Sequence, residues 1–230
     1  MKETLLSGAR ELGLELTEET ADKLCAFGQA VIRQNEVMNL TAITEPTAVA
    51  QLHLLDSLTL LKVADPKGKS IIDVGCGAGF PGVPTAIACP EARVTLLDSL
   101  GKRMNWLETV LPQLGVRARC ITARAEEAVA DHREKFDFAT SRAVARLNIL
   151  LELTAPYVRV GGAVLALKGS AAREELEEAK SAVKKLGLRL EAIHDFQIAG
   201  ATHSVIVLRK VSSTPNQYPR RFAKIKQAPL

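Results

Sequence analysis

The sequence predicts an α/β fold, in which a mostly parallel sheet has helices on both faces, includes one antiparallel strand and is preceded by N-terminal helices. Residues 1–64 have a helical pattern, whereas from residue 70 onward short apolar runs alternate with amphipathic stretches. The last two apolar runs are joined only by Asp195–His203. This connection is too short for a helical crossover, so these two strands should pair as an antiparallel hairpin.

The first 64 residues are predicted to form a helical extension. Thr17 can cap a helix whose first turn holds Glu18 and Glu19, where negative charge is favourable. Pro46 suits the first position of a further helix. The expected apolar faces of these two helices are formed by Leu24, Phe27 and Val31, and by Val49, Leu52, Leu55, Leu58 and Leu61.

Residues 65–210 are predicted to form the α/β core, and residues 211–230 a basic C-terminal tail. The expected strands are Ser70–Val74, Arg93–Leu97, Arg119–Ala123, Phe136–Thr140, Ala163–Lys168, Arg189–His194 and Ser204–Arg209. The expected helices between them are Gly82–Ala88, Lys102–Leu114, Glu126–Ala130, Leu147–Val158 and Ala171–Leu186. This order of strand, helix and strand indicates parallel pairing for most of the sheet.

The composition is that of an ordinary globular protein, because 47% of the 230 residues are hydrophobic and 24% are charged. We find no secretory signal, no apolar run of membrane-spanning length and no metal-ligand spacing. The four cysteines form no CxxC pair, which favours free thiols in a reducing compartment. We therefore expect a cytoplasmic protein, and we expect it to be a monomer without a membrane partner.

The basic residues are unevenly distributed. The segment from Arg209 to Leu230 holds six of the 30 basic residues and no acid, so residues 1–208 carry 24 basic against 26 acidic residues. Such a basic arm favours polyanions, above all nucleic acid. The tail by itself agrees equally well with a solvated segment that aids solubility. The RNA-binding candidates within it are Arg220, Arg221, Lys224 and Lys226.

The segment from Asp73 to Gly79 carries the strongest chemical signal, because it follows the first predicted strand directly. In a doubly wound sheet, ligands bind beyond the carboxyl ends of the strands near the switch point. Gly75, Gly77 and Gly79 allow close approach of a ligand to the backbone, and the helix starting near Gly82 directs amide groups toward the same place. The acid Asp73 suits the amine and sulfonium of S-adenosylmethionine, whereas it would repel a pyrophosphate.

A dinucleotide site is the alternative for this segment, because Gly77, Gly79 and Gly82 match the G-x-G-x-x-G pattern. In that pattern the first glycine opens the turn immediately after the strand, and Gly77 comes two residues too late. The pattern therefore favours a methyltransferase over a dinucleotide-binding protein. A glycine turn without any ligand is a third interpretation.

Three further positions follow later strands at the same expected edge of the sheet. Asp98 can accept hydrogen bonds from ribose hydroxyls, or it can simply cap the following helix. Ala125 and Glu126 are placed where they could meet adenine. Arg142 could hold the cofactor or a phosphate, and its alternative is an exposed arginine without a role. His53 and Asp56 share a helix face, either as an active-site pair or as a local hydrogen bond.

These motifs, taken together, resemble the ribosomal RNA small subunit methyltransferase G family, also called glucose-inhibited division protein B. The resemblance spans nearly the whole chain, and the Gly-Phe-Pro-Gly continuation at Gly79–Gly82 is its most specific part. The tail differs from the family at Phe222, where a glycine is expected. The other matching segments are Asn39–Ile43, His53–Ser57, Asp73–Gly82, Arg124–Glu126, Ser141–Val144 and Tyr218–Arg220.

The resemblance implies a class I methyltransferase with a Rossmann-like sheet that methylates ring nitrogen N7 of a guanine in 16S ribosomal RNA. It implies that S-adenosylmethionine contacts Gly75, Phe80, Ala125, Glu126 and Arg142; Asp73, Gly77, Gly79 and Asp98 are added from the architecture. The partner would be 16S ribosomal RNA or the small ribosomal subunit particle. Because N7 has a lone pair and no proton to lose, no general base is expected, and we assign Arg142 only a positioning role.

Two other functions remain open at this level. A small-molecule methyltransferase would need neither the basic tail nor the N-terminal helices. A non-catalytic RNA-binding assembly factor would not need an intact glycine loop. Cofactor binding together with methyl transfer to RNA distinguishes the three.

Overall fold

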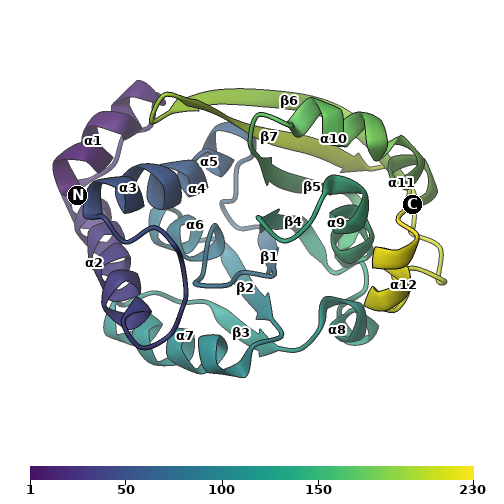
Figure 1. Cartoon of the computed structure of the whole chain (residues 1–230), viewed down its shortest axis with the longest axis horizontal. Helices are drawn as coiled ribbons and strands as arrows, with labels where there is room; N and C mark the ends of the chain where they lie inside the picture. Colours follow the sequence, from purple (N-terminus) through teal and green to yellow (C-terminus); the bar gives the residue numbers. More distant parts are fainter.

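A computed structural model describes residues 1–230 and contains one seven-stranded sheet in the order β3-β2-β1-β4-β5-β7-β6 (Figure 1). The strands are β1 (Ser70–Val74), β2 (Arg93–Asp98), β3 (Arg119–Thr122), β4 (Phe136–Arg142), β5 (Val158–Lys168), β6 (Leu188–Ile198) and β7 (Ala201–Lys210). Only β7 runs in the opposite direction to the other strands, and it pairs antiparallel with β5 and β6. This confirms the predicted mixed sheet and its terminal hairpin. Ala199 and Gly200, both at positive φ, connect β6 to β7 with a twist that suits such a hairpin.

The N-terminal 64 residues are helical, as predicted. Thr17 caps α2 by accepting from the Thr20 amide, and Pro46 begins α3. From Pro46 to Val63 the chain is almost continuously helical, with a π-helical stretch in its middle. These elements are α1 (Lys2–Glu11), α2 (Glu18–Asn35), α3 (Pro46–Val49), the π-helical η1 (Ala50–Leu55), α4 (Asp56–Leu58) and α5 (Leu60–Val63).

The remaining helices lie between or after the strands. They are α6 (Gly82–Ala88), α7 (Gly101–Gln113), α8 (Ala125–His132), α9 (Leu147–Thr154), the 3₁₀ turn η2 (Ala155–Tyr157), α10 (Ala172–Glu178), α11 (Lys180–Lys185) and α12 (Phe222–Gln227). Two predicted helices are shortened or interrupted. The one predicted over Leu147–Val158 ends at Thr154, because Pro156 has no amide hydrogen to continue it. The one predicted over Ala171–Leu186 is interrupted at Ala179.

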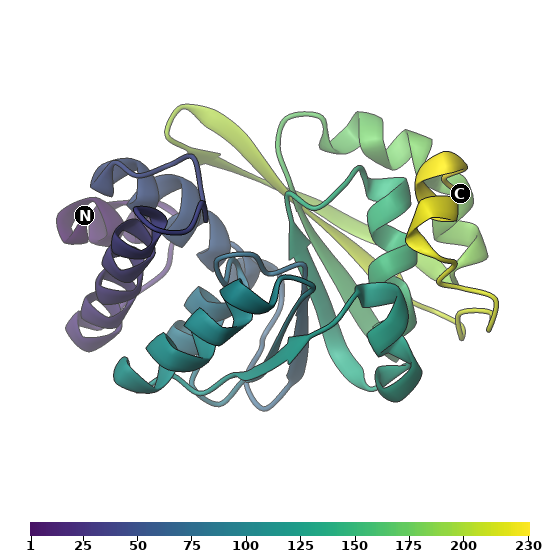
Figure 2. The same ribbon diagram turned by 60° about the horizontal axis from the view of Figure 1, so that its bottom comes forward.

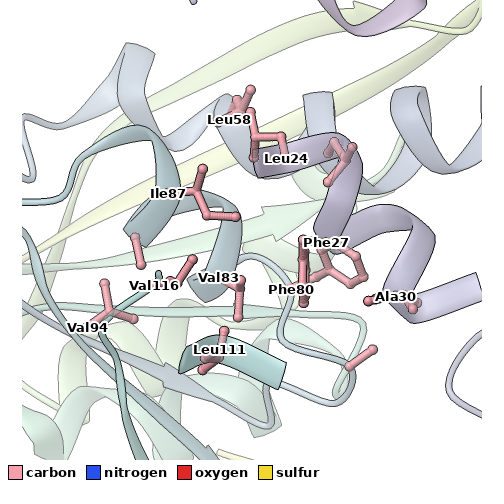
Figure 3. Packing of buried hydrophobic residues seen from close by; sticks show 14 of the residues in the cluster. Leu24, Phe27, Ala30, Leu58, Phe80, Val83, Ile87, Val94, Leu111 and Val116 are labelled. Carbon is pink, nitrogen blue, oxygen red and sulfur yellow. The ribbon is translucent and has the colours of Figure 1, made fainter. Parts of the chain in front are cut away.

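The two largest hydrophobic cores lie on opposite faces of the sheet, and Figure 2 shows the helices that cover these faces. Neighbouring residues of β1 serve opposite faces, because Ile71 belongs to one core and Ile72 to the other. The first core joins the sheet to α6, α7 and the N-terminal helices. Figure 3 shows its contact between Phe27 of α2 and Phe80 of the glycine loop, the segment 75–81 between β1 and α6. The centroids of the two rings lie 5.3 Å apart. The second core joins the opposite face to α8 through α12.

The C-terminal residues, predicted as a basic tail, fold back onto the core. Tyr218 and Ile225 are buried in the second core, and α12 packs against α9. Arg220 forms an ion pair with Glu152 of α9, whose side chain is completely buried. The apolar residues inside the tail account for this packing, and they were not considered when the tail was described by its charge. None of the helices combines the length and the apolar character that a membrane span requires.

Candidate functional site

A cavity of about 550 Å³ opens at the carboxyl ends of β1, β2 and β4, where the strand order reverses direction. Its volume falls within the range of about 300–1,000 Å³ typical of small-molecule sites. In a doubly wound sheet this switch point is the expected place for a ligand. The cavity wall includes Gly75, Phe80, Asp98, Glu126 and Arg142.

The glycine loop after β1 needs glycine for two different reasons. Gly75 and Gly79 have positive φ, and an added Cβ would lie 2.5 Å from Val144 Cγ2 and 2.7 Å from Val83 Cγ2, respectively. At Gly77, with φ +56°, an added Cβ would meet only an Arg103 nitrogen at 4.0 Å, and the residue lines the cavity. Gly75 and Gly79 therefore permit close packing, whereas Gly77 leaves room beside the cavity. Gly79 itself does not line the cavity.

Asp73 lies below the glycine loop, and this corrects the expectation that its carboxylate faces the ligand. The side chain is fully buried and does not line the cavity. Its Oδ2 accepts a 2.7 Å hydrogen bond from the Gly82 amide, and its Oδ1 has no partner. Burial raises the pKa of Asp73 to about 7, although the Gly82 hydrogen bond opposes the shift. In this position Asp73 ties the end of β1 to the start of α6.

Asp98 at the end of β2 does not cap α7, which has no side-chain cap, and its role toward ribose hydroxyls stays a prediction. Its Oδ1 accepts from the Leu100 amide and its Oδ2 from the Gly77 amide, each at 2.9 Å. The residue therefore shapes the turn into α7 and fixes the glycine loop. It also lines the cavity, where its oxygens keep further lone pairs for a hydroxyl donor. Ala125 and Glu126 begin α8 and line the same cavity.

Arg142 ends β4 and is held by three contacts from the N-terminal helices. Its Nη1 donates to Asp56 Oδ2 at 2.8 Å and to the Leu52 carbonyl at 2.7 Å. Its Nη2 lies 3.1 Å from His53 Nδ1. The guanidinium also lies 5.2 Å from the centre of the Phe80 ring. Arg142 is thus neither an exposed arginine nor a free anion receptor, because most of its donors are already occupied.

His53 is neutral in this network. Burial and the nearby charge of Arg142 lower its pKa to about 4. His53 Nδ1 lies 3.1 Å from Arg142 Nη2 and 3.1 Å from the Leu52 carbonyl, and Nε2 lies 2.8 Å from Thr41 Oγ1. The ring stacks on Phe80 with centroids 4.7 Å apart. His53 and Asp56 do not pair with each other; both converge on Arg142.

Asp56 is the buried anion of this network, and its partner His203 was missed from the sequence. Asp56 Oδ1 lies 2.8 Å from His203 Nδ1. Burial works to raise the pKa of Asp56, but the His203 hydrogen bond and the Arg142 charge together outweigh it and lower the pKa. No local pattern marks His203, because it lies 147 residues from Asp56 and meets it only through the β6–β7 hairpin.

The four basic residues predicted to bind RNA are in different environments. Arg220 is committed to the buried Glu152, to which it donates at 2.6 Å and 2.8 Å. Arg221, Lys224 and Lys226 are exposed on and beside α12. Phe222, the residue that departs from the expected glycine, lines the 550 Å³ cavity. One short segment therefore contributes both to the cavity wall and to a basic surface.

The fold and the site define a class I S-adenosylmethionine-dependent methyltransferase, with a glycine loop after β1 and an acid after β2 at the switch point. The sequence model of the GidB family, described as rRNA small subunit methyltransferase G, matches residues 20–205. The chain belongs to this family.

Curated relatives match along the whole chain. The protein named Ribosomal RNA small subunit methyltransferase G in Desulfitobacterium hafniense is 43% identical over 226 residues, which is 96% of this chain and 94% of the relative. The protein of the same name in Pelotomaculum thermopropionicum is 43% identical and covers 100% of this chain and 99% of its own length.

Solved structures share the fold at low sequence identity. TYW2 of M. jannaschii, solved in complex with AdoMet, aligns with a TM-score of 0.56 and 14% identity, covering 68% of this chain and 75% of its own. TrmN from Thermus thermophilus aligns with a TM-score of 0.54 and 20% identity, covering 68% of this chain and 48% of its own. These likenesses concern the fold alone.

Proposed function

We propose that this protein transfers a methyl group from S-adenosylmethionine to N7 of a guanine in 16S ribosomal RNA. One observation carries the assignment of the site. The five residues that the family resemblance assigns to the cofactor all line a single cavity at the switch point, although they come from three separate parts of the chain. These residues are Gly75, Phe80, Ala125, Glu126 and Arg142.

The chain's own groups fit this cofactor. The open side of Gly77 gives a flat backbone surface beside the cavity. Asp98 has acceptor capacity for ribose hydroxyls, and Glu126 supplies a second acid at the next strand end. Leu97 and Leu100 contribute apolar wall to the same cavity, which suits the faces of an adenine ring.

The proposed reaction requires orientation more than acid–base chemistry. When bound, S-adenosylmethionine supplies an electrophilic methyl group: the N7 lone pair forms the N–C bond while the C–S bond breaks and its electrons remain on sulfur. N7 has no proton to lose, so the reaction needs no catalytic base, and His53 is held neutral with both ring nitrogens in hydrogen-bond contacts. The residues of the chain then act by positioning the reactants and excluding water.

Arg142 has a positioning role in this proposal. Its guanidinium is fixed by Asp56, the Leu52 carbonyl and His53, and it contacts the Phe80 ring at the cavity wall. It therefore sets the shape of the wall rather than donating to N7. A donor aimed at N7 would occupy the lone pair that has to attack. A free positive charge there would also oppose formation of the cationic product.

The proposed partner is 16S ribosomal RNA, alone or within the small subunit particle, in the cytoplasm, with the protein acting as a monomer. The exposed residues Arg221, Lys224 and Lys226 lie close in sequence to Phe222 of the cavity wall. RNA phosphates held by these cations would bring a neighbouring nucleotide toward the site. A guanine in folded RNA must be accessible or extruded to enter it.

The test uses small ribosomal subunits that lack the modification, incubated with the protein and methyl-labelled S-adenosylmethionine. Label should appear on one guanine of 16S ribosomal RNA as 7-methylguanine, mapped by reverse transcription and mass spectrometry. Arg142→Ala should reduce the single-turnover rate strongly with an unchanged circular dichroism spectrum, and Arg142→Lys should restore little. Cofactor binding without transfer to RNA would favour a small-molecule methyltransferase. Failure to bind the cofactor would favour an assembly factor.

A further inference from the structure

A second cavity, of about 600 Å³, lies against the cofactor cavity. The two share four wall residues, His53, Arg142, Ala143 and Val144. We propose that this second cavity receives the target guanine and that Glu175 of α10 recognises the base by accepting from its N1–H and 2-amino groups. This inference rests on the proposed function, because it concerns the acceptor of the same reaction.

Glu175 is the carboxylate of this cavity that retains an oxygen without a partner. Its Oε2 accepts from the Leu147 amide at 2.8 Å and pairs with Lys168 Nζ at 2.8 Å. Its Oε1 takes part in neither contact, and the side chain is only 14% exposed. Both oxygens of Asp56, the other acid of the cavity, are occupied. Glu175 is therefore oriented in advance by the protein and still has acceptor capacity.

The cations around this cavity are also paired, which leaves the guanine N7 lone pair free to attack. Arg142 is bound to Asp56, and Lys168 to Glu175 and to the Ala145 carbonyl at 2.6 Å. Arg146 is bound to Glu174 and Glu178 at 2.9 Å and 2.7 Å. Val144, which is 38% exposed and lines both cavities, offers an apolar surface for the face of a base.

Guanine has the chemistry that such a carboxylate selects. Its Watson–Crick edge presents two adjacent donors, N1–H and the 2-amino group, whereas adenine presents an acceptor at N1. Extruded bases are commonly read through hydrogen bonds to this edge. Methylation at N7 makes the ring cationic, which makes the N1–H and amino hydrogens more acidic. A contact with Glu175 would then become stronger as the reaction proceeds. An interaction accelerates a reaction when it is stronger in the transition state than in the ground state.

The experiment combines one protein change with one substrate change. Small-subunit particles are reconstituted with guanine or with inosine, which lacks the 2-amino group, at the mapped target position. Single-turnover methylation is measured for the wild-type protein, for Glu175→Gln and for a control variant with unchanged cavity residues. The variant Glu177→Gln is the matched control on α10, because Glu177 is 68% exposed, pairs with the exposed Lys180 and does not line the cavity.

The wild type should methylate inosine about tenfold to a hundredfold more slowly than guanine, as expected for the loss of a hydrogen bond to a charged group. Glu175→Gln should show a similar loss on guanine and little further loss on inosine, whereas Glu177→Gln should behave as wild type. Glu175→Gln should also bind the particles more weakly when S-adenosylhomocysteine is present, while calorimetry finds its cofactor affinity unchanged.

Equal wild-type rates on guanine and inosine would overturn the inference without any reliance on a variant. The inference would also be overturned if Glu175→Gln slowed the methylation of inosine by the same factor as that of guanine, because the two changes would then act independently. These outcomes are distinct from a failure of the proposed function, which would appear as absence of guanine methylation by the wild-type protein.

Discussion

Asp56 and Arg142, 86 residues apart in the sequence, form an ion pair with a 2.8 Å N–O distance at the boundary between the two cavities. Asp56 begins α4 of the helical extension, whereas Arg142 ends β4 of the sheet. His203 of β7 binds the second oxygen of Asp56. The helical extension, the sheet and the terminal hairpin therefore meet at one carboxylate, which makes the N-terminal helices part of the site.

Removal of the Asp56 charge should destabilise the fold. Asp56→Asn leaves the Arg142 guanidinium largely buried without its counter-ion, and such a change typically costs about 3–5 kcal/mol. Asp195→Asn is the control, because Asp195 pairs with Arg173 at the surface, where exposed pairs contribute about 0–1 kcal/mol. Urea unfolding of both variants gives the comparison. Equal losses of stability would contradict the structural importance of the buried pair.

Stability should decrease in acid partly through His53. The folded-state pKa of about 4 lies below the ordinary 6.5, so the unfolded chain binds the extra proton first. The contribution of neutral His53 to folding stability is fully present above pH 6.5 and is lost as the pH falls toward 4. At 1.36 kcal/mol per pKa unit, the loss amounts to up to about 3 kcal/mol. Stability measured from pH 4 to pH 7 should have a smaller slope in His53→Gln than in the wild type.

Asp73 makes folding stability depend on pH in the opposite direction to His53 over part of this range. Its pKa is raised to about 7, so its contribution is present below about pH 3.8 and is lost as the pH rises through 7. Asp73 is present in both the wild type and His53→Gln. The difference between their slopes of stability against pH therefore reports the titration of His53 alone. Parallel stability curves for the two proteins would show that His53 titrates normally in the folded state.

Cofactor affinity should depend on the open side of Gly77. Gly77→Asn places a side chain beside the cavity, while asparagine tolerates the left-handed backbone better than most residues. Gly68→Asn is a matched control, because Gly68 has φ +67° and nothing within 4 Å of an added Cβ. We expect calorimetry to find a large loss of S-adenosylmethionine affinity only in Gly77→Asn, with similar unfolding free energies for the two variants. Undiminished binding in Gly77→Asn would place the cofactor elsewhere.

The C-terminal basic residues should separate into two functional groups. Replacing Arg221, Lys224 and Lys226 with alanine should weaken RNA binding, and the slope of log affinity against log salt should become shallower by up to about 0.7–0.9 for each phosphate that is no longer neutralised. Arg220→Ala should instead lower stability, because it leaves Glu152 buried and unpaired. Filter binding across a salt series, with thermal unfolding alongside, tests both statements. An unchanged slope in the triple variant would assign RNA binding to another surface.

The sequence by itself determined the order of the core strands and helices, because hydrophobic periodicity and glycine position are local properties of a chain. Ser70–Val74 and Gly82–Ala88 have the predicted bounds, and the short connection before β7 was sufficient to predict the hairpin. The predicted glycine loop also lies at the switch point. Local patterns could not reveal that Asp73 lies beneath this loop, because its direction depends on the packing of α6 over β1.

Only the tertiary structure decided how the charged groups pair. From the sequence, Arg142 was a candidate anion receptor, His53 and Asp56 were a possible pair, and Arg220 was grouped with the RNA-binding residues. The structure joins Arg142 to Asp56 and Arg220 to Glu152 across separations of 86 and 68 residues. Apolar periodicity fixes which face of an element is buried, but an ion pair depends on where two distant elements meet. That meeting point is set by packing of the whole chain, and no local pattern encodes it.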